Sequence, residues 1–178
     1  GEGKEGWRVE ARGPDMAVEI SPAPRTRGTT VEVVDLFFNT PARRKFLRTE
    51  RTEYLRIEEV VRKVALSHPS ATFVLNHNGK TIKQYHGGED ESRRIAAVFG
   101  QAFIDNAVFL SEENESYGLK LRGWIGQPTY SRSQADQQYF FVNDRMIRDK
   151  LVTHAIKQAY ADVLYHGRNP VFGLFLDR

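Results

Sequence analysis

β-branched and aromatic residues follow a break at Gly28 and predict a strand over residues 29–38. Apolar side chains fall on both faces of this strand, which predicts a position inside a sheet. Asn39-Thr40-Pro41 ends the strand and begins a short helix. Thr40 is a suitable N-cap, and Pro41 is tolerated at the first helical position because it lacks only a donor that would have been unpaired.

A longer helix is predicted from Thr49 or Thr52 to about Leu66, and Ser67-His68-Pro69 ends it. Five residues at helical spacing are predicted to face inward along it: Tyr54, Ile57, Val61, Val64 and Ala65. A helix stop and a change of periodicity coincide here, so we place a domain boundary between residues 68 and 69.

Short strands dominate the pattern after the boundary. Residues 71–76 and 81–85 flank Asn78-Gly79, a strong hairpin signal. A helix over 92–99 stops at Gly100, and strands follow over 107–111 and 119–125. On the last of these strands, Lys120, Arg122 and Trp124 share one face. That face is compatible with nucleic-acid contact or with a solvated sheet surface.

The remaining pattern predicts a polar loop over 127–137, a strand over 138–142, a turn at Asn143-Asp144 and a return strand over 145–148. Asp149 then caps a helix to about Leu164, and a last strand covers 171–176. The inward stripe of this helix is predicted to be Leu151, Ala155, Ala159 and Val163. Helices that alternate with short strands indicate an α/β (α+β) sandwich.

Composition narrows the functional classes. The 178-residue chain is 40% hydrophobic, has a net charge of +3 and lacks cysteine, which excludes disulfides and thiolate metal sites. Its five histidines lack zinc-site spacing, so we predict no metal site. The longest apolar runs are too short for a membrane span, and the opening GEGKEGWRVE does not resemble a signal peptide.

Two charged or glycine-rich segments have alternative interpretations. Gly1–Gly6 matches G-x-G-x-x-G by letter, but no strand precedes it, so we interpret it as a turn. Arg43, Arg44 and Lys45 lie at the start of a helix, where the dipole disfavours cations. Acidic neighbours, a solvated face, an anionic partner or a regulatory contact would each accommodate them.

Three segments carry a family resemblance that covers nearly the whole chain. GTTVEVVDLFFNTPARRKFL, RTERTEYLRIEEVVRKVAL and FFVNDRMIRDKLVTHAIKQAY resemble the MutL family of DNA mismatch-repair proteins, which includes the MLH and PMS branches, and the bacterial members most of all. The resemblance implies that residues 1–68 are the C-terminal portion of a Bergerat (GHKL) ATPase domain. Residues 69–178 would form a ribosomal protein S5 domain 2-like (transducer) domain that is truncated at its end.

The same resemblance implies ATP and Mg as cofactors of the parent protein. The family's catalytic motifs, a DAG-x-T-x-I-like run and GFRGEAL, are absent from these residues and would precede Gly1. We therefore expect a fragment that has no catalytic residues, is inactive alone and holds no cofactor by itself. Gly28 and Thr29 match the family's GT pair, whose threonine lies near the adenine, and are our nucleotide-binding prediction.

The family resemblance also implies DNA binding with little sequence preference. The best candidate contacts match the basic VNxRxxRD segment and the helix after it: Arg145, Arg148, Lys150 and Lys157. Arg43, Arg44 and Lys45 are the second set. From the residues alone, an ordinary solvated turn is an equal alternative for the first set. A helix N-terminus there would add free backbone donors for phosphate.

The expected partners are duplex and single-stranded DNA, a second copy in a dimer, a MutS-like mismatch-recognition protein, a nicking endonuclease and a helicase. The expected location is the bacterial cytoplasm at the nucleoid, without membrane contact. Three other functions compete with this one: the transducer of another GHKL ATPase such as a type II topoisomerase, an S5-like RNA-binding module, and a scaffold without ligand. The NTPARRKF block argues against the topoisomerase.

Overall fold

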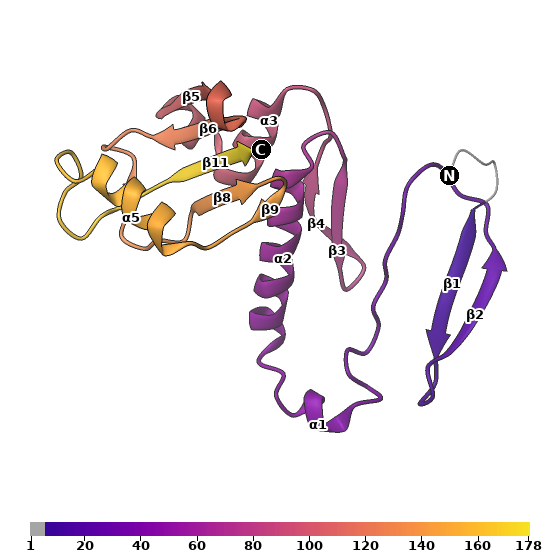
Figure 1. The fold of residues 1–178 in the computed structure, drawn as a ribbon. Helices are drawn as coiled ribbons and strands as arrows, with labels where there is room; N and C mark the ends of the chain where they lie inside the picture. Colours follow the sequence, from indigo (N-terminus) through magenta and orange to yellow (C-terminus); the bar gives the residue numbers. More distant parts are fainter. Residues whose placement is uncertain (1–5) are drawn as a thin grey trace. The chain divides into compact units, whose positions relative to one another are not determined.

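The computed structural model describes residues 6–178, which divide into two compact units between Glu53 and Tyr54 (Figure 1). Each unit is described by itself. The turn predicted at Gly1–Gly6 falls almost entirely outside the described residues. The domain boundary predicted between residues 68 and 69 lies inside the second unit and stays a prediction.

The first unit contains an antiparallel hairpin and one short helix. Strand β1 (Trp7–Arg12) pairs with β2 (Ala17–Pro22), with Trp7 opposite Pro22. Helix α1 covers Pro41–Arg44 and begins after Thr40, as predicted. The Thr40 side chain makes no capping hydrogen bond, however, and its hydroxyl is buried without a partner.

The strand predicted over residues 29–38 is wrong for this structure. The segment is extended chain and turns, and Val31, Val33 and Val34 are exposed. No strand of the described residues pairs with it, so its backbone groups have no ladder to join. Positive φ angles of 51° at Asp35 and 62° at Phe37 also bend the chain away from an extended path.

Helix α2 (Glu50–Ser67) joins the two units, and Thr49 is its cap because the Thr52 N–H donates to Thr49 Oγ1 at 3.3 Å. The predicted inward stripe is partly wrong. Ile57 and Val64 are exposed, whereas Glu58 and Leu66 are buried. The buried side of the helix therefore includes a charged residue, Glu58, which pairs with Arg62 and Lys83 within the second unit.

The next elements follow the predicted order. Strands β3 (Phe73–His77) and β4 (Lys80–Tyr85) form a hairpin around Asn78-Gly79. Helix α3 (Glu91–Phe99) is capped by Asp90, which accepts from the Ser92 N–H at 3.0 Å, and it stops at Gly100. Helix α4 (Gln101–Asp105) was not predicted.

A five-stranded sheet with the order β5-β6-β11-β8-β9 forms the centre of the second unit. Only the β11–β8 pair is parallel. Its strands are β5 (Ala107–Asn114), β6 (Leu119–Gly126), β8 (Gln138–Val142), β9 (Arg145–Met146) and β11 (Phe172–Asp177). The 3₁₀ turn η1 (Glu115–Tyr117) joins β5 to β6, and β7 (Ser131–Arg132) pairs with β10 (Asn169–Pro170). The predicted loop over 127–137 therefore contains a short strand.

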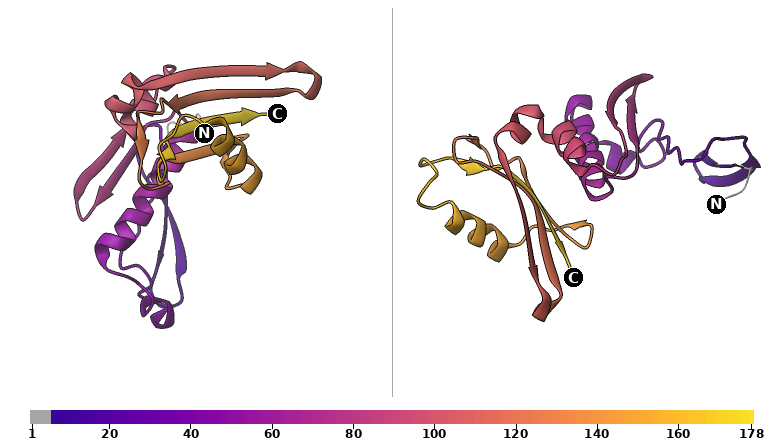
Figure 2. Two further views of the ribbon diagram at one scale, coloured as in Figure 1. Left: turned by 90° about the vertical axis from the view of Figure 1, so that its left-hand side faces the viewer. Right: turned by 90° about the horizontal axis from the view of Figure 1, so that it is seen from above.

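Helices cover both faces of this sheet. Figure 2 shows α5 (Lys150–Ala159) on one face and α3 with α2 on the other, so the predicted α/β sandwich is confirmed. The main core lies on the α3 face. It consists of Leu66, Ile95, Phe99, Phe103, Tyr139, Phe141, Val171 and Phe175. An added Cβ at Gly173 would lie 3.2 Å from the Phe99 ring, so glycine lets the helix approach the strand closely.

The predicted stripe of α5 is wrong by one position. Leu151 is 80% exposed, while Val152 and Ile156 are half-buried and Tyr160 is buried. The helix ends at Ala159, earlier than predicted, and the Tyr160 hydroxyl donates to the Gly126 carbonyl at 2.6 Å. Two of the predicted positions are alanines, which are found on both buried and exposed helix faces, so the hydrophobic pattern did not identify the buried face.

The predicted basic and aromatic face of β6 is solvated only at Lys120, because Arg122 and Trp124 are half-buried. Trp124 packs against the core and against the Phe109 ring at 4.8 Å. Arg122 pairs with Glu91 and lies 5.0 Å from the centre of the Phe175 ring. Both side chains therefore belong to the interior between the sheet and α3.

One buried guanidinium joins several segments of the second unit. Arg94 on α3 is 3% exposed and donates to the carbonyls of Ala65, His68, Pro69, Ala71 and His86. No carboxylate among the described residues pairs with it, and its charge is compensated by these carbonyls and by the rings of Phe73 and Tyr85. Burial lowers the pKa of Arg94 from its usual value.

We expect Arg94→Met to lower the free energy of unfolding by about 3 kcal/mol, because it leaves several buried carbonyls without a donor. Arg93→Met is the matched control, since the neighbouring Arg93 side chain is 88% exposed, and its effect should stay within about 0.5 kcal/mol. Denaturant unfolding followed by circular dichroism measures both. Equal stabilities for the two variants would contradict the role assigned to Arg94.

Candidate nucleic-acid interface

A tight turn positions the basic residues before α5. Asn143 and Asp144 have φ angles of 45° and 63°, which suit the two central residues of a type I′ hairpin turn. The Asn143 N–H donates to the Leu176 carbonyl at 3.0 Å, so the turn is fixed to the end of β11. Arg145 follows on the short edge strand β9 and is exposed.

Three of the four first-choice DNA residues line one hollow on α5. Arg148, Lys150 and Lys157 are exposed and surround a pocket of about 290 Å³ together with Asp149, Thr153 and His154. None of these three cations forms an ion pair with another described residue. Arg145 does not line this pocket. The structure thus places three long cationic side chains around one exposed concave surface.

Two of the backbone donors at this helix end are not free. The Asp149 carboxylate accepts from the Leu151 N–H at 2.8 Å and from the Val152 N–H at 3.0 Å. Asp149 is the predicted cap, and it occupies two of the backbone donors that were predicted to be available for phosphate. Attraction for an anion here must come from side chains, and Asp149 opposes it.

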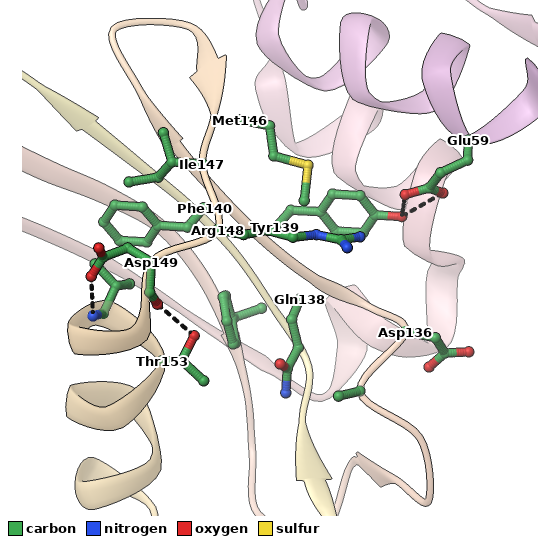
Figure 3. Close-up of a pocket in the computed structure, with 13 residues that line it drawn as sticks. Glu59, Asp136, Gln138, Tyr139, Phe140, Met146, Ile147, Arg148, Asp149 and Thr153 are labelled. Atoms are coloured by element: carbon green, nitrogen blue, oxygen red, sulfur yellow. Dashed lines mark hydrogen bonds between the residues drawn. The ribbon is translucent and has the colours of Figure 1, made fainter. Parts of the chain in front are cut away.

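A second pocket of about 310 Å³ adjoins the first and shares Arg148, Asp149 and Thr153 with it (Figure 3). Its lining includes two further acids, Glu59 and Asp136. Three carboxylates around one arginine do not favour a phosphate. The pocket that Arg148 shares with Lys150 and Lys157 is therefore the better candidate for an anion.

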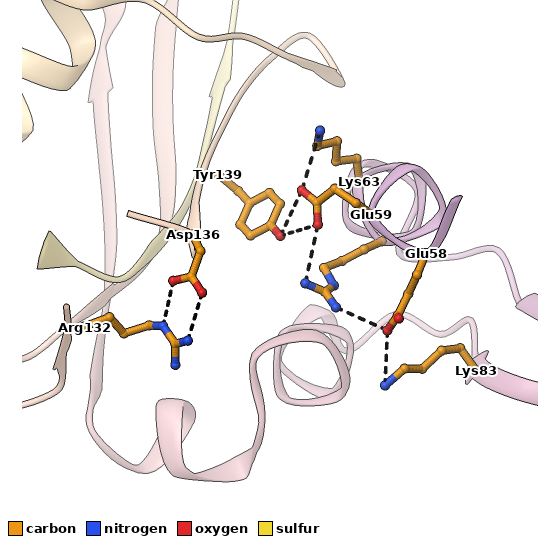
Figure 4. Close-up of polar contacts among 8 residues, drawn as sticks. Glu58, Glu59, Lys63, Lys83, Arg132, Asp136 and Tyr139 are labelled. Atoms are coloured by element: carbon orange, nitrogen blue, oxygen red, sulfur yellow. Dashed lines mark hydrogen bonds and ion pairs between the residues drawn. The ribbon is translucent and has the colours of Figure 1, made fainter. Parts of the chain in front are cut away.

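Two basic residues of α2, Arg62 and Lys63, are already engaged by acids (Figure 4). Arg62 pairs with Glu58 at 3.3 Å and with Glu59 at 3.4 Å, and Lys63 and Lys83 pair with the same two carboxylates. The Tyr139 hydroxyl donates to Glu59 at 3.1 Å. Although burial alone lowers the pKa of Arg62, contacts with Tyr139 and Glu59 raise it overall. This network connects α2 to the sheet and is unsuited to binding DNA.

Burial, aided by the charge of Glu59 and opposed by Arg62, raises the pKa of Tyr139 from 10.0 to about 12. The neutral hydroxyl therefore stabilises the fold fully below pH 10.0, and this contribution is lost as the pH rises to about 12. We expect Tyr139→Phe to make the free energy of unfolding fall less steeply across this pH range. Denaturant unfolding at several pH values measures the slope. The exposed Tyr165, changed to Phe, should leave it unaltered.

The other predicted site residues lie in the first unit. Arg43, Arg44 and Lys45 are exposed at α1 and form no ion pair within the described chain, so no acidic neighbour compensates them. Gly28 and Thr29 are exposed, and open space surrounds Gly28. These two residues alone do not form a nucleotide pocket, and their nucleotide contact stays a prediction. Across residues 6–178, no cluster of acids and histidines suits a metal ion.

Solved structures with this fold define the class of protein. The chain aligns over 98% of its length with a MutL ATPase domain from Aquifex aeolicus complexed with ADP, at a TM-score of 0.68, 27% identity and 62% of that chain. The N-terminal domain of a DNA repair protein matches at a TM-score of 0.70 and 21% identity, over 89% of this chain and 52% of that one, which supports the fold alone.

Sequence comparison narrows the class to a family. A family profile described as "DNA mismatch repair protein, C-terminal domain" matches residues 95–178. The chain is 59% identical over 175 residues to the MutL protein of Cellvibrio japonicus and 56% identical over 176 residues to that of Pseudomonas paraeruginosa. Each alignment covers 97% of this chain and 28% of the relative. The chain belongs to the MutL family of DNA mismatch-repair proteins.

None of the helices formed by the described residues has the length and apolar character needed to cross a bilayer.

Proposed function

We propose that this chain supplies a DNA-contacting surface to a protein that coordinates DNA mismatch repair. The shared hollow of Arg148, Lys150 and Lys157 carries the proposal, because three exposed cations that pair with no described acid line it. Membership of the MutL family and the spacing of these residues in VNDRMIRDKL support it. Arg145 lies three residues before Arg148 and extends the same basic segment onto β9.

The chemistry of this surface favours DNA binding with little sequence preference. Lysine and arginine at an open hollow attract phosphates, whereas reading bases requires side chains placed in a groove. We expect dissociation constants of about 10⁻⁴–10⁻⁶ M at physiological salt. Duplex and single-stranded DNA both present the phosphates that this surface would contact.

The wider function concerns the parent protein. This chain spans about 28% of the length of the curated relatives that it matches. We propose that the parent binds ATP with Mg, as the ADP complex of the Aquifex aeolicus domain suggests for the nucleotide. Gly28 and Thr29 would contact that nucleotide only in a pocket that other residues of the parent complete. A dimer, a MutS-like protein, a nicking endonuclease and a helicase are the proposed partners, in the bacterial cytoplasm at the nucleoid.

Charge reversal at the hollow tests the DNA surface. We expect Arg148→Glu/Lys157→Glu to abolish duplex binding at low salt, because two attractive charges become repulsive. Single reversals should reduce the slope of log affinity against log salt by about one for each lost phosphate contact. Fluorescence anisotropy with labelled duplex DNA over a salt series measures both quantities.

Two matched variants control this experiment. Lys80→Glu/Arg93→Glu reverses two exposed cations on β4 and α3 and should bind almost like the wild type. Arg43→Glu/Arg44→Glu tests the second candidate set. Equal losses in all three variants would mean that only net charge matters. Stronger competition by structured RNA than by DNA would favour the S5-like RNA-binding alternative.

A gain of affinity is expected when the acid in the hollow is removed. Asp149→Asn keeps a good N-cap and so preserves α5, but it deletes one negative charge beside Arg148 and Lys150. We expect DNA affinity to rise roughly two- to fivefold at low salt, measured by the same anisotropy titration. Unchanged affinity in a folded Asp149→Asn would place the phosphates away from this hollow.

A further inference from the structure

The two edges of the central sheet differ in length. Strand β9 forms one edge with two residues, whereas β5 forms the other with eight. Figure 2 shows β5 and β6 as a long ribbon that projects past the rest of the sheet. Short edge strands offer few pairing sites, and long ones offer a template for another strand. The β5 edge is therefore the one that a further strand would extend.

The register of β5 identifies the backbone groups on its open side. The Gln127 N–H donates to the Asn106 carbonyl at 2.8 Å, just beyond the first pair of the β5–β6 ladder. Hydrogen-bonded and non-hydrogen-bonded pairs alternate in an antiparallel ladder. The residues that turn their N–H and C=O groups outward are therefore Ala107, Phe109, Ser111 and Glu113. No strand of the described residues pairs with them.

Strand β5 lacks most features that prevent edge-to-edge pairing. It contains no proline and no lysine, and its register with β6 runs through eight pairs without a bulge. The β3–β4 hairpin, by contrast, shifts register between Leu75 and Asn76. Only the acidic residues at the end of β5, Glu112 and Glu113, limit which strands can pair with it, because they repel acidic segments.

The surface around this edge is apolar at its start and acidic at its end. Val108 and Phe109 are 50% and 53% exposed. Residues 105–118 carry four acids, Asp105, Glu112, Glu113 and Glu115, and no base, although the chain as a whole is positive. Lys120 lies opposite Glu113 on β6 without forming an ion pair among the described contacts. This surface repels phosphates and attracts cations.

We propose that the outer edge of β5 binds an extended, basic segment of a partner protein as an additional antiparallel or parallel strand. Backbone hydrogen bonds to Phe109, Ser111 and Glu113 would hold the segment. Its apolar side chains would cover Val108 and Phe109, and its lysines or arginines would meet Glu112 and Glu113. A second copy of this chain is the poorer occupant. Antiparallel pairing of two β5 edges would place the acidic end of each opposite the apolar start of the other, where no cation meets it, and parallel pairing would place acid beside acid. This inference does not depend on the DNA surface.

The probe is a short synthetic peptide with valines in one half and lysines in the other, blocked at both ends and labelled for fluorescence anisotropy. We expect saturable binding to the 178-residue chain below about 1 mM, and weaker binding as salt rises. Two control peptides separate the contributions. Glutamate in place of lysine tests charge, and N-methylation of alternate amides removes the donors that would face β5. Both controls should bind at least about fivefold more weakly.

Variants of the chain locate the site. Ser111→Pro removes an outward N–H without removing a β5–β6 ladder bond, so we expect about fivefold weaker peptide binding. Ser111→Ala keeps that N–H and should bind like the wild type. Glu112→Lys/Glu113→Lys should abolish binding. Circular dichroism verifies the fold, and the N-methylated peptide supplies the same test if Ser111→Pro unfolds.

Several outcomes would overturn the proposal. They are an absence of saturation with the valine–lysine peptide, equal binding of the glutamate peptide, equal binding of the N-methylated peptide, and wild-type affinity in folded Ser111→Pro. Sedimentation gives a further outcome. A dimer of the wild-type chain that Ser111→Pro dissociates would make a second copy the occupant, and the proposed basic partner would then be wrong.

Discussion

The second unit depends on one buried guanidinium, that of Arg94. Five carbonyls from the end of α2, the loop before β3 and the segment after β4 accept its hydrogen bonds. Because the geometry of a guanidinium is planar and fixed, these segments hold fixed positions relative to α3. Helix α3 in turn packs Ile95 and Phe99 against the sheet that carries the basic hollow. The position of the candidate DNA surface thus follows from a contact on the opposite side of the sheet.

Local signals predicted most of the second unit. Asn78-Gly79, Gly100 and Asp149 set turns and helix ends through short-range geometry, and each lies at the predicted place. The facing of α5 was mispredicted because alanine packs on either side of a helix, so periodicity alone does not identify the buried stripe. The role of Arg94 had no sequence signal, since its five acceptors are backbone carbonyls that any residue would supply.

The candidate site was only partly readable from the sequence. The basic residues near α5 were predicted, and the structure brings three of them around one hollow. Two features of the site depend on side-chain positions, which residue spacing does not specify. Asp149 accepts hydrogen bonds from helix N–H groups, and Glu58 and Glu59 neutralise Arg62 and Lys63. In the segment 29–38, a strong local signal predicted a strand that the structure lacks. Strand propensity there is strong, but a strand also requires a neighbouring strand with which to pair.

Arg94 and the hollow on α5 respond oppositely to dissolved ions. The charge of Arg94 is balanced by buried carbonyl dipoles and ring faces, which salt screens poorly, whereas the hollow attracts its ligand through exposed charges that salt screens well. Concentrated electrolyte should therefore strip nucleic acid from this protein while its architecture persists. Purification on an anionic resin with a salt gradient would exploit this difference and deliver folded, ligand-free material.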